Sequence, residues 1–126
     1  MWPDVEVELV AHLASRTGAR MVTELPATLD KILPVGQIQR VGGVDDGFRL
    51  DRALVDVDVY AATRRDASAL ARQIQYELVV ELRGRQTANA VFGRISTVSA
   101  PSWRPYENAL LRRCGATYAM HFHPVS

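Results

Sequence analysis

Residues 53–84 read ALVDVDVYAATRRDASALARQIQYELVVELRG, and a strand pattern gives way to a helix pattern part-way through them. Within residues 53–61, valines at every second position alternate with Asp56, Asp58 and Tyr60. A period of two is that of a β-strand, whose successive side chains point to opposite faces. The segment is therefore predicted to be a strand with one buried face and one polar face.

Residues 63–83 carry the strongest helix pattern of the chain. Thr63 is placed to cap the first turn, and Gly84 is placed to end the last one. At ~1.5 Å per residue the helix would be about 30 Å long, enough to cover a small sheet. Its apolar residues recur on one side: Ala67, Leu70, Ala71, Ile74, Leu78 and Leu82.

Upstream of this unit, the pattern predicts a helix and two strands. Pro3 and Asp4 suit a helix start, and Gly18 suits a helix end. The glycine-rich run GGVDDGF, residues 42–48, is predicted to be a flexible loop or hairpin tip. The other expected elements are a helix at 4–16, a strand at 20–24, a helical turn within 28–33 and a strand at 36–41.

Downstream, residues 85–89 are predicted to form a polar turn before a strand at 92–99. A last strand is expected at 111–122. Between these strands, residues 100–110 form a long excursion that holds Trp103 and Tyr106 between and beside two prolines. The residue before a proline is biased toward extended or turn conformations, so this segment is predicted to be a loop.

The expected fold class is α+β, in the order α-β-β-β-α-β-β. No strand–helix alternation of the parallel type is present, so one mainly antiparallel sheet of about five strands follows, with two helices packed on one face. The other face must then meet water or a partner. A length of 126 residues predicts a single domain spanning residues 1–126.

Composition narrows the function classes. A net charge of +1 argues against strong non-specific nucleic-acid binding, which needs a basic surplus. Cys114 is the only cysteine, so neither a disulfide within the chain nor a cysteine-based zinc motif can form. The first residues lack the basic and apolar regions of a secretory signal. No apolar run approaches the ~20 residues that cross a bilayer, so no membrane role is expected.

Asp56 and Asp58 share one face of their predicted strand, and Asp51 lies a little upstream. Paired carboxylates can hold a divalent ion or share a proton, so a small metal-dependent enzyme that uses these three residues is one hypothesis. Strand alternation alone also explains the pattern, and we expect the aspartates to pair with arginines at a subunit interface rather than to act in catalysis.

Other residues with chemical potential lack the partners that their chemistry needs. His121 and His123 share a strand face, but zinc requires at least one further ligand. Cys114 beside Arg112 and Arg113 is more typical of a small core residue than of a nucleophile. No serine-hydrolase elbow or phosphate-binding loop is present. The sequence therefore gives no positive support for an enzyme and implies no cofactor.

The excursion carries residue types that are typical of protein interfaces. Trp103, Arg104 and Tyr106 belong to the types enriched among residues that dominate binding energy. Trp103 has two open interpretations, a contact to a partner or an anchor in the chain's own core, because a sequence does not show which way an indole points.

Three blocks resemble the tail terminator proteins of long, non-contractile-tailed phages, within the broader group of tail-completion and head–tail joining proteins. They are WPDVEVELVAHLASRTGARMVTELP, RVGGVDDGFRLDRALVDVDVYAATRRDASALARQI and VSAPSWRPYENALLRRCGATYAMHFH. The resemblance implies a non-enzymatic α+β subunit without cofactor that assembles into a ring, typically hexameric. Such a ring caps the tail tube, stops its polymerisation and offers a surface for head joining.

The resemblance implies a virion protein of the phage tail or neck, assembled in the host cytoplasm. Its partners would be further copies of itself, the tail tube protein and a head–tail connector protein, and DNA would pass through the ring without specific binding. A connector nearer the portal is the alternative in the same setting. A monomeric ligand-binding domain is a further alternative.

The family supplies no short binding motif, so the interface residues are predicted from this chain alone. The loops at 42–48 and 100–110 are expected to project toward the tube or a neighbouring subunit. Arginines of one subunit would meet carboxylates of the next. The residues concerned are Arg49, Trp103, Arg104, Tyr106, Arg112 and Arg113, with Asp45, Asp46, Asp56 and Asp58 as acceptors.

Overall fold

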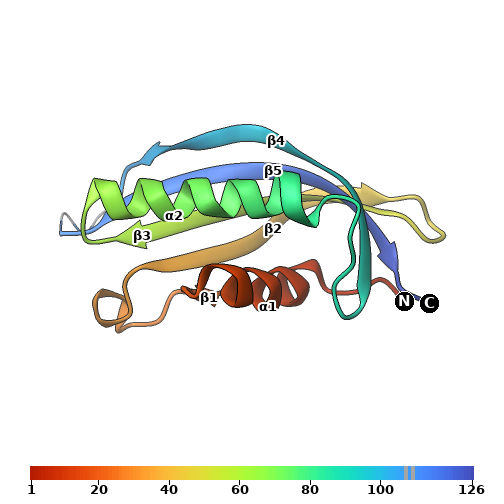
Figure 1. Cartoon of the computed structure of the whole chain (residues 1–126), viewed down its shortest axis with the longest axis horizontal. Coiled ribbons are helices and arrows are strands. Elements are labelled where there is room, and N and C mark those ends of the chain that lie inside the picture. Colours follow the sequence, from red (N-terminus) through yellow and green to blue (C-terminus); the bar gives the residue numbers. More distant parts are fainter. Residues whose placement is uncertain (107, 109) are drawn as a thin grey trace.

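The computed structural model describes residues 1–106, 108 and 110–126. These residues form two α-helices and five strands in the predicted order α-β-β-β-α-β-β (Figure 1). Two short helical turns accompany them, a 3-10 turn at Leu29–Lys31 and a π-helix at Glu77–Leu82. The elements are α1 (Val5–Thr17), β1 (Arg20–Val22), β2 (Val35–Asp45), β3 (Asp51–Ala61), α2 (Arg64–Tyr76), β4 (Ala90–Arg104) and β5 (Arg112–Pro124).

Both α-helices begin at side-chain caps. The Asp4 carboxylate accepts hydrogen bonds from the backbone N–H groups of Glu6 and Val7, so Asp4 caps α1 rather than opening it. The Thr63 hydroxyl accepts one from Asp66 N, which confirms the cap predicted for the second helix. Gly18 ends α1 with φ 74°, a left-handed conformation that glycine adopts without steric cost.

The predicted helix at 63–83 changes its winding after Tyr76. It continues as the π-helix Glu77–Leu82 and stops before Gly84, whose φ is 76°. Its apolar residues from Leu70 to Leu82 recur at a strict interval of four, which exceeds the ~3.6 residues of an α-turn and would rotate them off the core face. A wider turn corrects this drift and keeps Leu78 and Leu82 buried.

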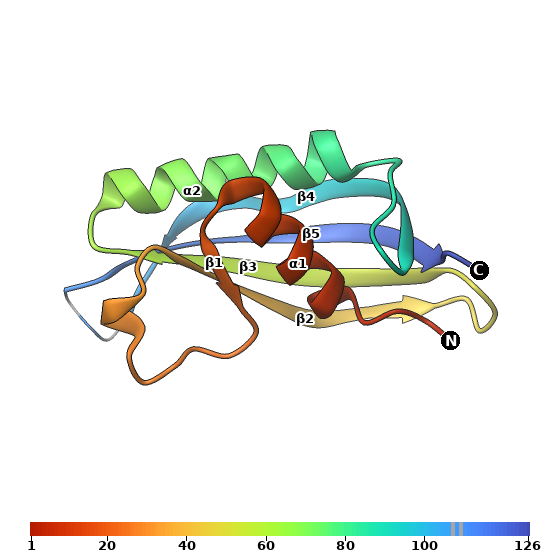
Figure 2. The ribbon, with the colours of Figure 1, turned by 60° about the horizontal axis from the view of Figure 1, so that its bottom comes forward.

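The strands form one mixed sheet in the order β1-β2-β3-β5-β4. Only β1, which runs parallel to β2, departs from antiparallel pairing. In Figure 2, α1 crosses in front of the strands and α2 runs along the sheet. The predicted α+β class, with a mainly antiparallel sheet, is confirmed. Among the residues that the structure describes, no helix is long and apolar enough to span a membrane.

Part of each of the two predicted loops is strand. β2 continues to Asp45, so only residues 46–50 form the tip of the β2–β3 hairpin. The glycines do not break β2 because they pair with β3, and a bulge between Arg40 and Gly42 absorbs the irregularity. β4 likewise runs to Arg104, well into the predicted excursion at 100–110. Residues 107 and 109 of that excursion lie outside the described residues.

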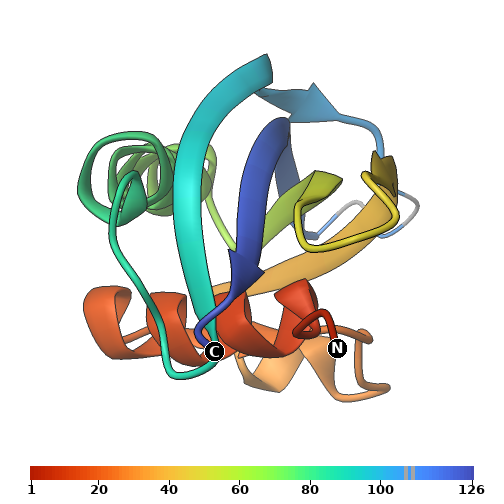
Figure 3. The same ribbon diagram turned by 90° about the vertical axis from the view of Figure 1, so that its right-hand side faces the viewer.

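Alternation along β3 sorts its side chains between two faces. Val55, Val57 and Val59 join the main core with Leu9 of α1 and Ile74 of α2, so both helices cover the same face. Figure 3, which looks along the long axis, shows the two helices on one side of the twisted strands. We call this helix-covered side the inner face and the opposite side the outer face.

The outer face is partly covered by the chain itself. Tyr60 and Val35 lie there, in a second buried cluster with Leu29 and Leu111, and the segment between β1 and β2 supplies further apolar contacts. The expectation that this face meets only water or a partner is therefore wrong where the second cluster covers it. The rest of the outer face carries the polar side chains of β3, β4 and β5.

Candidate functional site

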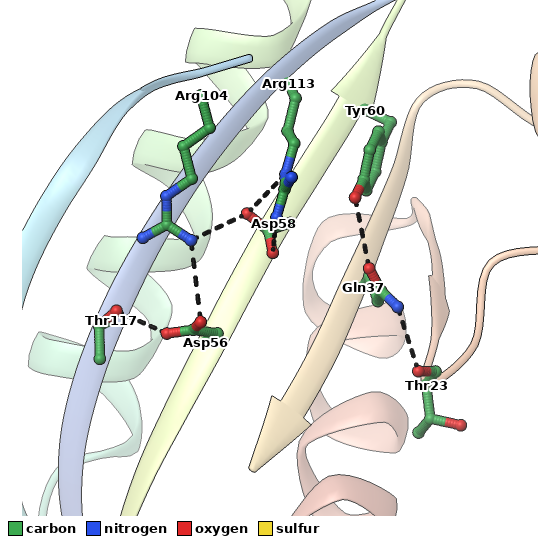
Figure 4. A network of polar contacts seen from close by, with 8 residues as sticks. All are labelled: Thr23, Gln37, Asp56, Asp58, Tyr60, Arg104, Arg113 and Thr117. Atoms are coloured by element: carbon green, nitrogen blue, oxygen red, sulfur yellow. Dashed lines mark hydrogen bonds and ion pairs between the residues drawn. The ribbon is translucent and has the colours of Figure 1, made fainter. Parts of the chain in front are cut away.

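Asp58 is the centre of an ion-pair network on the outer face (Figure 4). Its side chain is only 3% exposed. Arg113 of β5 donates to both carboxylate oxygens, with Nε–Oδ1 3.2 Å and Nη2–Oδ2 3.1 Å. Arg104 of β4 donates from Nη1 to Oδ1 at 3.2 Å. Hydrogen bonding to Asp58 raises the pKa of the Arg113 guanidinium, which favours its charged form.

Gly115 makes this network possible. It lies opposite Asp58 in the β3–β5 register, so Arg104 must cross over it to reach Asp58 from β4. A Cβ at this position would overlap the Asp58 carboxylate and lie 2.7 Å from Cδ and Cζ of Arg104. Sequence reasoning missed Gly115, because its role appears only once the strand order is known.

Asp56 lies next to the network on the same strand face. It accepts a hydrogen bond from the Thr117 hydroxyl at 2.5 Å, and its Oδ2 is 3.8 Å from Arg104 Nη1. Of the predicted inter-subunit pairs, those that join Arg104 and Arg113 to Asp56 and Asp58 are therefore formed within one chain. Asp45 and Asp46, the other two predicted acceptors, take no part in these ion pairs.

Arg104 and Arg113 of this network also line a hollow of about 410 Å³. Trp103 on its wall is 41% exposed and belongs to neither core cluster, so the structure contradicts the core-anchor interpretation. The Arg64 guanidinium stacks 4.3 Å from the Trp103 ring centroid. We call this feature the arginine hollow; its lining is Arg64, Trp103, Arg104, Tyr106, Leu111, Arg112 and Arg113.

The arginine hollow brings together five of the predicted interface residues, Trp103, Arg104, Tyr106, Arg112 and Arg113. Tyr106 packs edge-on against buried Tyr60, with ring centroids 5.1 Å apart, which ties the wall to the second core cluster. Arg64 was missed by sequence reasoning. It follows the cap residue Thr63 at the start of α2. A charged residue at this position is typical of a solvent-exposed helix start, so no sequence pattern indicated its contact with Trp103.

The remaining predicted residues, Asp45, Asp46 and Arg49, lie at the hairpin tip. Figures 1 and 2 place this tip at the opposite end of the long axis from the β4–β5 connection. The Asp46 carboxylate accepts hydrogen bonds from the backbone N–H groups of Phe48, Arg49 and Leu50, which lower its pKa and order the turn. Arg49 reaches back to the Pro124 carbonyl at 3.0 Å.

The three aspartates of the metal hypothesis do not converge. Asp51 is buried on the inner face, where Arg40 binds both of its oxygens at 2.7 and 2.8 Å. Asp56 and Asp58 lie on the outer face, already engaged by Thr117 and the arginines. Among the described residues, no group of three or more His, Cys, Asp or Glu side chains is placed to hold a metal ion.

Among the described residues, Cys114 and the histidines also lack the partners of a catalytic site. Cys114 is buried, and burial raises the pKa of its thiol, which disfavours the reactive thiolate. His123 lies 3.4 Å from the Arg49 guanidinium through Nδ1. The two ends of the molecule expose charged and aromatic side chains.

Comparison with known proteins adds one finding on the fold. No protein-family model matches the sequence, and no curated protein matches it either. Among solved structures, the chain is similar to one described as "Virion of native gene transfer agent (GTA) particle", with a TM-score of 0.66 and 14% sequence identity over 94% of each chain. The chain therefore shares its complete fold with a chain of that virion particle.

Proposed function

We propose that this chain is a structural virion protein, a tail terminator that forms a ring on the end of a phage tail tube. The observation that carries the proposal is the fold shared with a chain of the gene transfer agent virion, which extends over 94% of both chains. The three sequence blocks that resemble tail terminators support it from a separate direction. Both point to an assembly protein rather than to an enzyme.

The proposed mechanism is mechanical. Copies of the chain, six in the typical case, contact one another head to tail, and each copy presents two different surfaces so that the ring closes. One side of the ring binds the last ring of tail tube protein, and the other side binds the head–tail connector protein. Polymerisation stops because the second side does not reproduce the surface that recruits tube subunits. DNA passes through the ring without specific binding.

The polar character of the chain supports this role. Assembly requires exposed charged and aromatic side chains on a firm scaffold, and the arginine hollow supplies them on β4, β5 and α2. A single domain of this size would act in the virion tail or neck after assembly in the host cytoplasm. The proposed assembly needs no cofactor, because docking of one protein surface on another involves no covalent chemistry.

Deleting the gene and imaging the particles tests the proposal. The expected result is tails of abnormal length that do not join heads, restored by supplying the intact chain. Tails of normal length that join heads in the deletion would contradict terminator function. A connector nearer the portal is distinguished by its partner: a terminator co-purifies with the tail tube protein, whereas a connector co-purifies with the portal-side ring.

A further inference from the structure

The arginine hollow gathers the side chains of four arginines, Arg64, Arg104, Arg112 and Arg113. Arg104 and Arg113 share the buried carboxylate of Asp58, and Asp56 Oδ2 lies 3.8 Å from Arg104 Nη1. Arg64 is exposed and stacks on Trp103, and no carboxylate is recorded against it among the described residues. The α2 N-terminus adds the positive end of a helix dipole beside Arg64. Its lining therefore suits an occupant that combines negative charge with an aromatic or apolar group.

The hairpin tip at the far end of the same chain has this combination. Phe48 is 86% exposed and Val44 is 66% exposed, which is unusual for large apolar side chains of an ordered turn. Asp45 and Asp46 are exposed beside them. The tip is held in shape before any contact, because Asp45 accepts from Gly47 N at 2.8 Å and Trp2 Nε1 donates to the Arg49 carbonyl at 2.9 Å.

The tip cannot reach the hollow of its own chain, because the hollow is lined from the start of α2, the end of β4 and the start of β5. Figures 1 and 2 show these segments at the opposite end of the long axis from the tip. We propose that the hairpin tip of one copy docks into the arginine hollow of the next copy. Phe48 packs against Trp103, and the carboxylates of Asp45 and Asp46 meet Arg64 and its neighbours. The inference rests on the proposed ring, for which it supplies the two complementary surfaces of a head-to-tail contact.

The geometry of the contact favours a second copy over other occupants. A hollow of about 410 Å³ is large enough for one aromatic side chain but shallow enough to leave the arginines at its rim. A preformed tip loses little conformational freedom on docking, which favours even a small interface. The arginines of two hollows would repel each other, which disfavours a hollow-to-hollow contact.

Disulfide trapping tests the contact directly. The variant Phe48→Cys/Arg64→Cys is expected to form a ladder of covalent oligomers on mild oxidation of concentrated full-length protein. Its two cysteines are too far apart within one chain for a disulfide, which requires Cα atoms within about 7 Å. The single variants Phe48→Cys and Arg64→Cys are the matched controls and should give no ladder, because native Cys114 is buried.

Charge reversal tests the polar part. Asp45→Arg and Arg64→Glu should each weaken self-association about tenfold, as measured by sedimentation, and the combination should recover most of the loss. Arg94→Glu, at an exposed arginine of β4 outside the hollow, is the control for Arg64→Glu, with the same change in net charge. Circular dichroism confirms that each variant is folded before it is compared.

The outcomes separate this inference from the proposed function. Ring-sized particles without the disulfide between positions 48 and 64 would overturn the docking and leave the ring intact. Absence of any ladder in the double variant would overturn the docking, whereas terminator function is judged independently on the deletion tails. An oligonucleotide that binds the intact chain, loses binding in Arg64→Glu and blocks no self-association would assign the hollow to nucleic acid and also overturn the docking.

Discussion

At the scale of single residues, Asp58 holds together strands that are distant in sequence. Replacing it by asparagine removes the charge that balances Arg104 and Arg113, both only about a quarter exposed, at 25% and 28%. We expect Asp58→Asn to lower the free energy of unfolding by about 2–3 kcal/mol, since unpaired and partly buried cations are poorly solvated. Chemical denaturation measures the change.

Asp56→Asn is the matched control for that variant. Its side chain is 25% exposed and lies 3.8 Å from Arg104, so solvent screens most of the interaction. A loss within about 1 kcal/mol is expected. Equal losses in the two variants would show that the buried position of Asp58 does not determine its contribution.

Gly115 is the second residue on which the network depends. In Gly115→Ala, the new methyl group would displace either the Asp58 carboxylate or the Arg104 side chain. We expect a loss of about 1–3 kcal/mol in unfolding free energy, because at least one charge-assisted hydrogen bond is lost. Gly93→Ala in β4 is the control: its nearest neighbour would lie 3.8 Å away, an ordinary contact. A tolerated Gly115→Ala would show that Arg104 does not need the path over β5.

The sequence predicted part of this residue-scale picture. Alternation correctly placed Asp56 and Asp58 on one strand face, and we expected both aspartates to pair with arginines. It could not predict that these arginines belong to the same chain, because this depends on β5 lying between β3 and β4. Nor could it predict Arg64 beside Trp103, a contact between a helix start and a strand end 39 positions apart that no local pattern records.

At the scale of elements, α1 is held against the π-helix and the turn after it by buried polar groups. The Glu77 carboxylate accepts a hydrogen bond from Arg16 Nε of α1 at 2.9 Å. His12, on the same helix, has its Nε2 buried and without a hydrogen-bond partner among the described residues. Burial lowers the pKa of His12 and outweighs the opposing charge of Glu77; the nearby Arg16 charge lowers it further.

A pH dependence of stability follows from His12. Because its pKa is lower in the folded chain than the ~6.5 of an unfolded one, the unfolded state binds the proton first as the pH falls. The free energy of unfolding should therefore decrease between about pH 7.5 and 5.5. In His12→Leu this part of the decrease should vanish, whereas His121→Leu on the outer face should retain it. Denaturation at the two pH values measures both.

The Glu8 carboxyl group also makes stability depend on pH, but at a lower pH than His12 does. Burial alone would raise the pKa of Glu8, but hydrogen bonds from Thr87 and Asn89 outweigh it and lower the pKa overall. Its stabilisation is lost only as the pH falls below an unfolded value near ~4.3, outside the window used for His12. An unchanged pH slope in His12→Leu would show that the buried imidazole does not control the dependence.

The element-scale predictions succeeded where periodicity and caps agree. Thr63, Gly84 and Gly18 lie at the helix ends as predicted, and the order of elements is as expected. The hairpin tip predicted within residues 42–48 is present at 46–50, but both predicted loops were drawn too long, because glycine and proline were interpreted as breaks. Pairing to β3 keeps residues 42–45 in β2, and pairing to β5 keeps residues 100–104 in β4. Such tertiary pairing is not encoded in the local pattern.

At the scale of the whole molecule, a net charge of +1 conceals an uneven distribution of charged side chains along the long axis. Arginines gather around the hollow, and Asp45 and Asp46 lie on the hairpin tip at the other end. The ion pairs that stabilise the fold involve the largely buried carboxylates Asp51 and Asp58. Salt should therefore act differently on the folding of one chain and on the contact between two chains.

This difference gives a prediction for self-association. Raising the salt concentration from about 0.05 to 0.5 M shortens the screening length severalfold, from roughly 14 to 4 Å, and weakens exposed charge pairs far more than buried ones. We expect the association constant from sedimentation to fall by about tenfold or more, since the docked tip and hollow attract through rim charges. The thermal midpoint of the dilute monomer should change by only a few degrees over the same range.

Phe48→Ala separates the apolar part of the contact from the charged part. It should weaken association at both salt concentrations by a similar factor, because burial of an aromatic ring does not depend on screening. Asp45→Asn keeps an oxygen acceptor for Gly47 N while removing one charge, so its effect should be large at low salt and small at high salt. An association constant that rises with salt would mean that apolar surface alone joins the copies, and the separation of charge between the two ends of the chain would then play no part in assembly.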